Sequence, residues 1–219
     1  MKRTITTILL ALVALSIASC QREEKPTTTP APVKAPAAPQ VTVKTNHGSF
    51  IVELNQEKAP VTVANFLSYV DKKHYDGTVF HRVIGTFMIQ GGGFELKDGS
   101  LVEKTTGEAI TNEAKNGLKN DRGTIAMART GDPNSATAQF FINVNDNAML
   151  NAPNPDGHGY AVFGKVVQGM EVVDKIKAVN TAMRPLTMTH PATGEKITQP
   201  AGDVPTENVV IESITKVSN

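Results

Sequence analysis

A single arginine lies among strand-forming hydrophobic residues at positions 80–94, which read FHRVIGTFMIQGGGF. Phe80, Arg82 and Ile84 share one parity, the spacing of side chains along one face of a strand. The guanidinium of an arginine stays charged at any physiological pH and presents a rigid fork of N–H donors. Fixed in a half-buried strand, such a group could anchor a carbonyl or donate to a developing lone pair. This chemistry is electrostatic and transfers no proton.

Motifs for other chemistries are weak in this sequence. Gly91-Gly92-Gly93 lacks the lysine and the following helix of a phosphate loop. The acidic and histidine residues at positions 146–158 do not have EF-hand spacing, and no serine lies in a G-x-S-x-G elbow. The sequence therefore predicts no metal, no cofactor and no nucleophile.

The charge balance argues against nucleic acid as a partner. The chain carries 22 basic and 21 acidic residues, a formal net charge of +1. Loss of Lys2 and Arg3 with an N-terminal signal would leave 20 against 21, or −1. The sequence contains no arginine-rich run or basic patch, which a protein needs in order to bind the phosphate backbone of a nucleic acid.

The first twenty residues have the pattern of an export signal. Lys2 and Arg3 precede an apolar run at positions 8–17 that is too short to span a membrane. The ending LSIASC resembles the lipobox of bacterial lipoproteins, in which the cysteine becomes the acylated first residue of the mature protein. We predict a lipoprotein signal peptide at 1–19 and lipidation of Cys20. The alternative is an ordinary cleavage site that happens to lie beside a cysteine.

Residues 21–40 have the composition of a spacer. They contain five prolines, no aromatic residue and one branched aliphatic residue, Val33. Such a segment cannot bury enough apolar surface to offset its ordering entropy. At about 3 Å per residue, its extended length is roughly 60 Å. We predict that residues 20–40 form a lipidated, disordered tether to a membrane of the bacterial envelope. Gln21 after the cysteine resembles outer-membrane sorting in enteric lipoproteins, with the protein facing the periplasm.

Residues 41–219 have the length of one domain. Alternating patterns predict a hairpin at 41–54 and strands at 80–94, 123–127, 138–144, 159–167 and 208–217. Val63, Phe66, Leu67 and Val70 form the apolar stripe of one helix, and residues 169–179 predict a second. Residues 97–120, 129–137 and 183–205 are expected to be loops. Seven or eight short strands without a βαβ rhythm favour an antiparallel barrel or sandwich.

Three sequence blocks in this domain resemble the cyclophilins, a family of peptidyl-prolyl cis-trans isomerases. The first block matches the family signature at Tyr75, Thr78, Phe80, His81, Arg82, Val83, Ile84, Phe87, Met88, Gln90 and Gly91. The second lies at 127–143 and the third at 159–166. The sequence of these blocks is similar to that of the bacterial periplasmic branch of the family. The resemblance implies a mainly β fold, an eight-stranded antiparallel cyclophilin-like β-barrel capped by two α-helices.

The resemblance also implies an enzyme that rotates X-Pro peptide bonds in proline-containing polypeptides, here maturing cell-envelope proteins. Arg82 aligns with the catalytic arginine of the family. The aligned substrate-binding positions are His81, Phe87, Met88, Gln90, Ala128, Arg129, Gln139, Phe141, Met149, Leu150 and Tyr160. Among them, Phe87, Met88, Phe141 and Leu150 align with walls of a proline pocket, and His81 is expected to brace its strand. No cofactor is implied, and we expect a monomer.

Two site positions depart from common members of the family. Met149 stands where many eukaryotic members have tryptophan and bacterial members phenylalanine, and Tyr160 occupies the position of a pocket histidine. A competing interpretation is a membrane-tethered module or chaperone that binds proline segments with incidental turnover. The presence of Arg82 favours the enzyme, because a pure binder could lose it.

Overall fold

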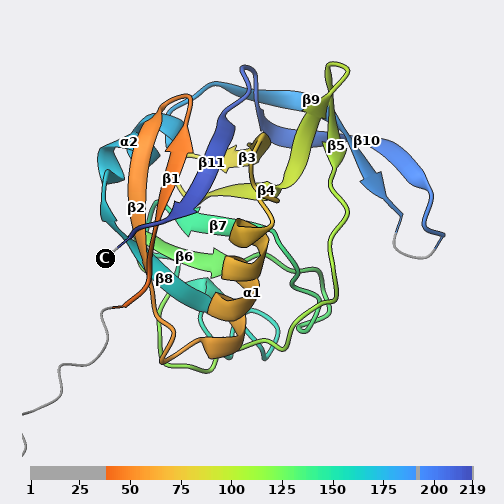
Figure 1. Cartoon of the computed structure of the whole chain (residues 1–219). Coiled ribbons are helices and arrows are strands. Elements are labelled where there is room, and N and C mark those ends of the chain that lie inside the picture. Colours follow the sequence, from red (N-terminus) through yellow and green to blue (C-terminus); the bar gives the residue numbers. More distant parts are fainter. Residues whose placement is uncertain (1–37, 191–192, 219) are drawn as a thin grey trace, which may run out of the picture. The chain divides into compact units, whose positions relative to one another are not determined.

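Eight of the strands close into a barrel in the computed structural model, which describes residues 38–190 and 193–218. Their order is β4-β3-β11-β1-β2-β8-β6-β7, and pairing of β7 with β4 closes the ring. The bounds are β1 Gln40–Thr45, β2 Gly48–Leu54, β3 Thr78–Ile84, β4 Met88–Lys97, β6 Thr124–Met127, β7 Phe140–Asn143, β8 Val162–Gln168 and β11 Val210–Lys216. Neighbouring strands of the ring are antiparallel, which confirms the predicted fold class (Figure 1).

Two helices cover the barrel, as expected. Helix α1 (Pro60–Asp71) buries Val63, Phe66 and Val70, and the Phe66 ring lies 5.2 Å from that of Phe163 inside the barrel. Helix α2 (Met170–Lys177) buries Val172, Val173 and Ile176. The predicted apolar stripe therefore faces the core, since burying one face of an amphipathic helix supplies most of its stability in a protein. A short 3-10 helix, η1 (Ala148–Leu150), lies between β7 and β8.

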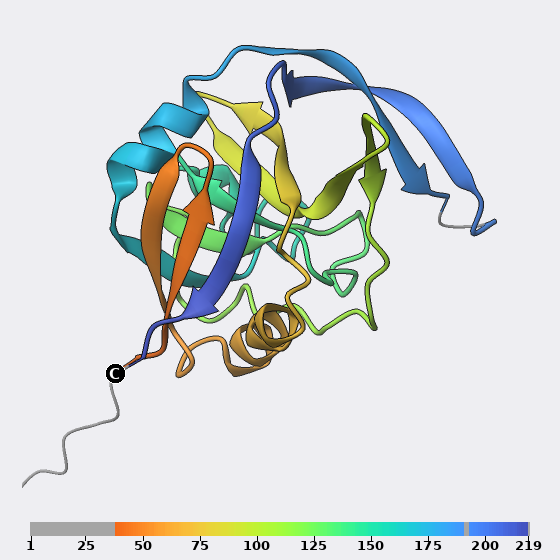
Figure 2. The same ribbon diagram turned by 45° about the horizontal axis from the view of Figure 1, so that its top comes forward.

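Three more strands extend the sheet outward from β4. These are β5 (Ser100–Glu103), β9 (Thr181–Thr189) and β10 (Lys196–Pro205), in the order β10-β9-β5-β4. Strand β9 runs parallel to β5, and β9 and β10 form an antiparallel hairpin that projects from the barrel (Figures 1 and 2). We call this element, residues 181–205, the β9–β10 hairpin.

The predicted loop at 183–205 is therefore wrong. The hairpin pairs over most of its length and buries Leu186 and Val204, whose neighbours come from strands far away in the sequence. Its prolines suggested a loop, but Pro185 and Pro200 lie opposite each other in the register. Proline disrupts a ladder only where its missing N–H would have donated. The prediction of a loop at 97–120 is likewise wrong at Ser100–Glu103, which form β5.

A bulge at His81 interrupts the regular alternation of β3. Phe80 pairs with Gly91 and Arg82 with Gln90, so His81 is an extra residue without a partner opposite it. Phe80 consequently lies in the barrel core while Arg82 is exposed, although the two share a parity. Bulges often re-aim side chains beside active sites.

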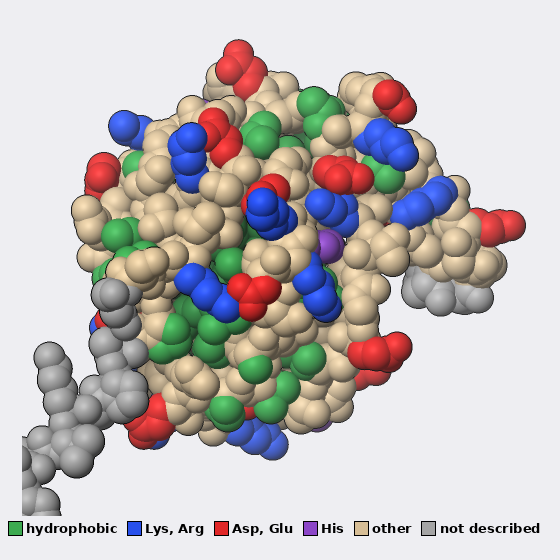
Figure 3. Space-filling view, viewed as in Figure 1, with side chains coloured by type: hydrophobic (Ala, Val, Ile, Leu, Met, Phe, Trp, Pro, Cys, Tyr) green, Lys and Arg blue, Asp and Glu red, His purple; other side chains and the backbone are tan. Residues whose placement is uncertain are grey.

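The charged residues mix without a large area of one sign on the face shown in Figure 3. Within the described residues, no helix is long and apolar enough to cross a bilayer.

Candidate active site

One row of paired residues crosses four strands of the barrel. Arg82 on β3 lies opposite Gln90 on β4, Gln90 lies opposite Phe141 on β7, and Phe141 lies opposite Ala126 on β6. Directly opposite residues of antiparallel strands share a face, with Cβ atoms roughly 5 Å apart. The row therefore places a guanidinium, an amide and an aromatic ring next to one another on the outer face of the barrel.

An apolar cluster surrounds the Phe141 end of this row, and we call it the Phe141 cluster. Its buried members are Met88, Ala126, Phe141, Leu150 and Val162, and its partly buried members are Ile84, Phe87, Leu118, Ala128 and Tyr160. Six of these ten residues were predicted from the sequence. Ile84, Leu118, Ala126 and Val162 were not assigned to the site. Strand parity points to Ile84 and Val162, which lie two residues from Arg82 and Tyr160.

The guanidinium of Arg82 is available to a ligand. Arg82 is exposed, and no described residue forms a hydrogen bond or ion pair with its side chain. Gln90 Nε2 instead donates to Gln139 Oε1 at 2.9 Å. The amide of Gln90 is thus held by Gln139. This bond leaves the Gln90 carbonyl oxygen free to accept.

His81 is a buried neighbour of Arg82 that stays neutral at pH 7. Its side chain packs on Phe94, with ring centroids 4.5 Å apart, and 4% of the residue is exposed. Burial, helped by the positive charge of Arg82, lowers the pKa of His81 to about 4. Nδ1 of His81 is buried and has no hydrogen-bond partner among the described residues. The bracing role expected for this histidine stays a prediction.

The guanidinium of Arg129 packs against the ring of Tyr160 and fixes its position. It lies 4.3 Å from the centre of the Tyr160 ring and donates to both carboxylate oxygens of Asp156, at 2.9 and 2.7 Å. Nε also donates to the carbonyl of Gly159 at 3.0 Å, and only 3% of the Arg129 side chain is exposed. Hydrogen bonds from Arg129 hold the pKa of Asp156 below its usual range. A substrate could therefore meet the Arg129 backbone more easily than its guanidinium.

Met149 is placed differently from the other predicted pocket residues. It lies on η1 with 58% of its surface exposed, whereas the neighbouring Leu150 is 8% exposed and belongs to the Phe141 cluster. Met149 therefore stands at the rim of the apolar surface, and Leu150 forms part of its wall.

A network of buried asparagines, which the sequence did not predict, supports this wall. Asn147 Nδ2 donates to the carbonyl of Phe87 at 2.8 Å and Asn143 Nδ2 donates to Asn120 Oδ1 at 3.2 Å. Asn120 Nδ2 reaches Asn151 Oδ1 at 3.1 Å, and its backbone carbonyl accepts from the Asn147 N–H at 2.8 Å. The three asparagines 120, 143 and 147 are at most 2% exposed. They tie Phe87 to the segment that carries Met149 and Leu150.

Replacing Asn143 by alanine is expected to lower the free energy of unfolding by about 2 kcal/mol, since removal of one partner leaves buried polar groups unpaired. Asn143 Oδ1 accepts from Asn147 at 2.7 Å, and that donor would lose its partner. Urea denaturation measures the change. Asn180→Ala is the matched control, because Asn180 is exposed and its side chain forms no hydrogen bond with the described residues. Equal stability of the two variants would contradict a supporting role for the network.

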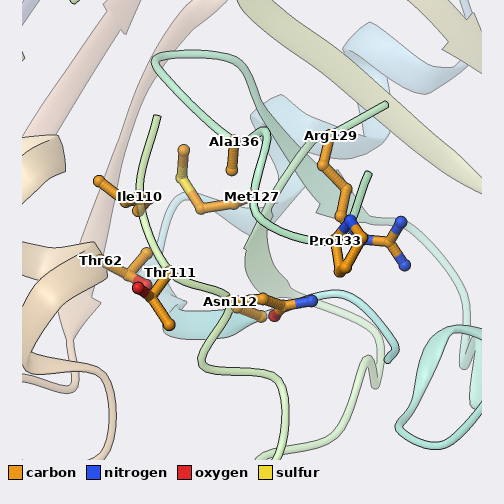
Figure 4. A pocket seen from close by; sticks show the side chains of 9 residues that line it. Thr62, Ile110, Thr111, Asn112, Met127, Arg129, Pro133 and Ala136 are labelled. Carbon is orange, nitrogen blue, oxygen red and sulfur yellow. The ribbon is translucent and has the colours of Figure 1, made fainter. Parts of the chain in front are cut away.

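A small cavity behind Arg129 does not extend the site. Its volume is about 10 Å³, the space of one water molecule at most. Figure 4 shows Arg129 and Pro133 on one side of it and Ile110 and Thr62 on the other. Nor does any group of three or more His, Cys, Asp or Glu in the described part of the chain have the arrangement of a metal site.

Comparison with known proteins gives the family of this fold and site. The family model described as "Cyclophilin type peptidyl-prolyl cis-trans isomerase/CLD" matches residues 40–216. A peptidyl-prolyl cis-trans isomerase of Streptomyces antibioticus is 53% identical over 175 residues, covering 79% of this chain and 95% of the relative. Peptidyl-prolyl cis-trans isomerase B of Escherichia coli is 52% identical over 177 residues, covering 80% and 98%.

A solved structure shows the same fold. The cyclophilin-type isomerase of Cryptosporidium parvum, crystallised in the presence of the dipeptide Ala-Pro, superimposes with a TM-score of 0.63 at 27% identity. The match covers 82% of this chain and 99% of that one. The chain belongs to the cyclophilin-type peptidyl-prolyl cis-trans isomerases. Its activity is accordingly the rotation of X-Pro peptide bonds.

Proposed function

We propose that Arg82 is the catalytic residue and that the substrate proline packs on the Phe141 cluster. Rotation of an X-Pro bond breaks amide resonance and faces a barrier of about 20 kcal/mol, but it makes and breaks no covalent bond. In the twisted amide the nitrogen regains a lone pair, to which a fixed guanidinium can donate. The observation that carries this proposal is the row Arg82–Gln90–Phe141. It sets an exposed cation, which has no partner among the described residues, beside a buried apolar surface.

The surroundings of this row suit the reaction. Met88, Phe141 and Leu150 are at most 8% exposed, so they present a rigid apolar wall to the proline ring. Water excluded by that ring would leave the donor and the amide nitrogen in a medium of low dielectric constant, where their interaction is stronger than in water. Gln90 and the backbone near Ala128 are positioned to bond the substrate backbone.

We further propose that the enzyme acts on maturing proteins of the bacterial envelope while anchored by a lipid on Cys20. The support comes from the sequence: the lipobox-like ending at Cys20, the proline-rich spacer and the nearly neutral charge. Cys20 and residues 1–37 lie outside the described residues. A spacer of roughly 60 Å would let a monomeric barrel reach polypeptides near the membrane without crowding it.

Radioactive palmitate tests the anchor. In bacterial cells producing the full chain, the wild-type protein is expected to incorporate label and Cys20→Ala to incorporate none. Ser16→Ala is the matched control, since it changes the same signal but keeps the acceptor thiol. Label on Cys20→Ala, or an unlabelled but cleaved wild-type protein, would show that Cys20 lies beside an ordinary cleavage site.

A further inference from the structure

The β9–β10 hairpin is held against the barrel as a fixed wall. Leu186 pairs with Leu101 of β5, and both belong to a second apolar cluster with Val79, Phe94 and Val204. Glu103 adds polar contacts, because its carboxylate accepts the Thr189 N–H at 2.8 Å and its carbonyl accepts from Lys196 Nζ at 3.2 Å. At the base of the hairpin, the Thr206 N–H donates to the Asn180 carbonyl at 2.9 Å.

This wall shares a cavity with the candidate catalytic residues. The cavity has a volume of about 270 Å³. From the barrel it is lined by His81, Arg82, Gln90, Phe94 and Gln139, from β5 by Glu103, and from the hairpin by Leu186, Met188, Ala201 and Gly202. Arg82 and Gln90 therefore face two surfaces: the Phe141 cluster on one side and the hairpin on the other.

The two surfaces lie within reach of one extended peptide. Adjacent strands are about 4.8 Å apart, so Arg82 on β3 is roughly 10 Å from Phe141 on β7. An extended chain advances about 3.3 Å per residue, so the roughly 4.8 Å from Phe141 to Gln90 corresponds to one or two residues and the roughly 10 Å to Arg82 to about three. A peptide with its proline on Phe141 would thus carry a neighbouring side chain to the cavity, while Gln90 and Gln139 face its backbone.

The lining indicates what such a side chain would be. The hairpin contributes Leu186, Met188 and Ala201, and the barrel adds the ring of Phe94, so this part of the lining is apolar. Glu103 also lines the cavity, and its carboxylate accepts the Thr189 N–H of the hairpin. Methionine adapts its shape to different apolar partners. The volume is slightly below that of the smallest ligand pockets, roughly 300 Å³, and accommodates one or two side chains rather than a cofactor.

We propose that this cavity is a second substrate subsite that selects an apolar side chain one to three residues from the proline. The proposal rests on the proposed placement of proline on the Phe141 cluster. The β9–β10 hairpin then determines which substrate sequences are preferred. Arg82 lies between the subsite for the apolar side chain and the Phe141 cluster, which binds the proline.

Turnover of a peptide panel tests the subsite. The full chain is assayed with tetrapeptides containing one proline and either alanine or leucine at each flanking position. At the position that reaches the hairpin, leucine is expected to raise kcat/KM by about five- to tenfold over alanine. Met188→Ser should reduce that ratio to nearly one. Met183→Ser is the matched control, because Met183 lies on the same strand but is 73% exposed and does not line the cavity.

Methyl NMR of the methionines in the wild-type chain separates this proposal from the proposed proline site. A leucine-bearing peptide is expected to shift the methyl resonances of both Met88 and Met188, and an alanine-bearing peptide mainly that of Met88. A response at Met88 but never at Met188 would refute the hairpin subsite and leave the proline site intact. If neither methyl responds during turnover, both placements are wrong.

Discussion

Arg82→Ala is expected to lower kcat/KM for a proline tetrapeptide by about 10²- to 10³-fold, the usual loss when one preorganised donor to a transition state is removed. The fold should remain intact, since the side chain is exposed and forms no bond with the described residues. The thermal midpoint of the variant should therefore match that of the wild type. A protease-coupled or direct spectroscopic assay of cis-trans relaxation measures the rate.

Two further variants define what Arg82 does. Arg82→Lys keeps the charge but loses the planar fork of donors, so we expect a rate between those of wild type and alanine. Arg122→Ala is the matched control, because Arg122 is also exposed, bonds Asp174 at 2.7 Å and belongs neither to the row nor to the Phe141 cluster. An Arg82→Ala rate within about threefold of wild type would exclude Arg82 as the catalytic residue, given the loss expected for such a donor.

The same variant addresses the competing role as a binding module. If Arg82→Ala loses turnover and cells depending on the protein are impaired, isomerisation is the function that matters. If turnover is lost but cells are unaffected, binding of proline segments is the more important role. The Phe141 cluster would remain available to such segments in Arg82→Ala, because the cluster does not include Arg82.

The sequence predicted the parts of the molecule that depend on local patterns. The stripe Val63, Phe66 and Val70 predicted α1, since a helix buries residues of that spacing whatever it packs against. Alternating segments likewise predicted most barrel strands. The candidate site residues were predicted from the family motif, because apolar residues in strands do not by themselves distinguish a pocket from a core.

Features that depend on distant partners could not be read in the same way. The bulge at His81 exists only relative to the register of β4, so the shared parity of Phe80 and Arg82 gave no sign of it. The hairpin needs β5 as its neighbour, and its prolines and threonines alone suggest a loop. Of the buried asparagines, Asn120 and Asn147 lie in segments of turn residues, where asparagine is common for other reasons, and Asn143 is the last residue of β7.

Stability against acid should depend on His81. The folded-state pKa is about 4 and the ordinary value 6.5, so between these values the unfolded chain binds a proton that the native protein does not. The free energy of unfolding therefore falls as pH drops from 6.5 to 4. Each unit corresponds to about 1.4 kcal/mol, giving a loss of roughly 3 kcal/mol from this residue. His74, whose pKa burial also lowers, adds to the loss in the same direction.

Urea denaturation at pH 7 and at pH 4 measures the decrease in the free energy of unfolding. In His81→Gln we expect this decrease to be smaller than in the wild type by roughly 3 kcal/mol. His158→Gln is the matched control, because His158 is exposed. The readout is the slope of the unfolding free energy with pH, so a general destabilisation of His81→Gln does not obscure it. Asp156 affects this slope mainly below pH 4, because its pKa is depressed and its contribution to stability is lost only as pH falls below the ordinary value of 3.8. Identical slopes for wild type and His81→Gln would mean that His81 is not buried as a neutral group. In the proposed mechanism, a neutral His81 also leaves the guanidinium of Arg82 without a second positive charge beside it.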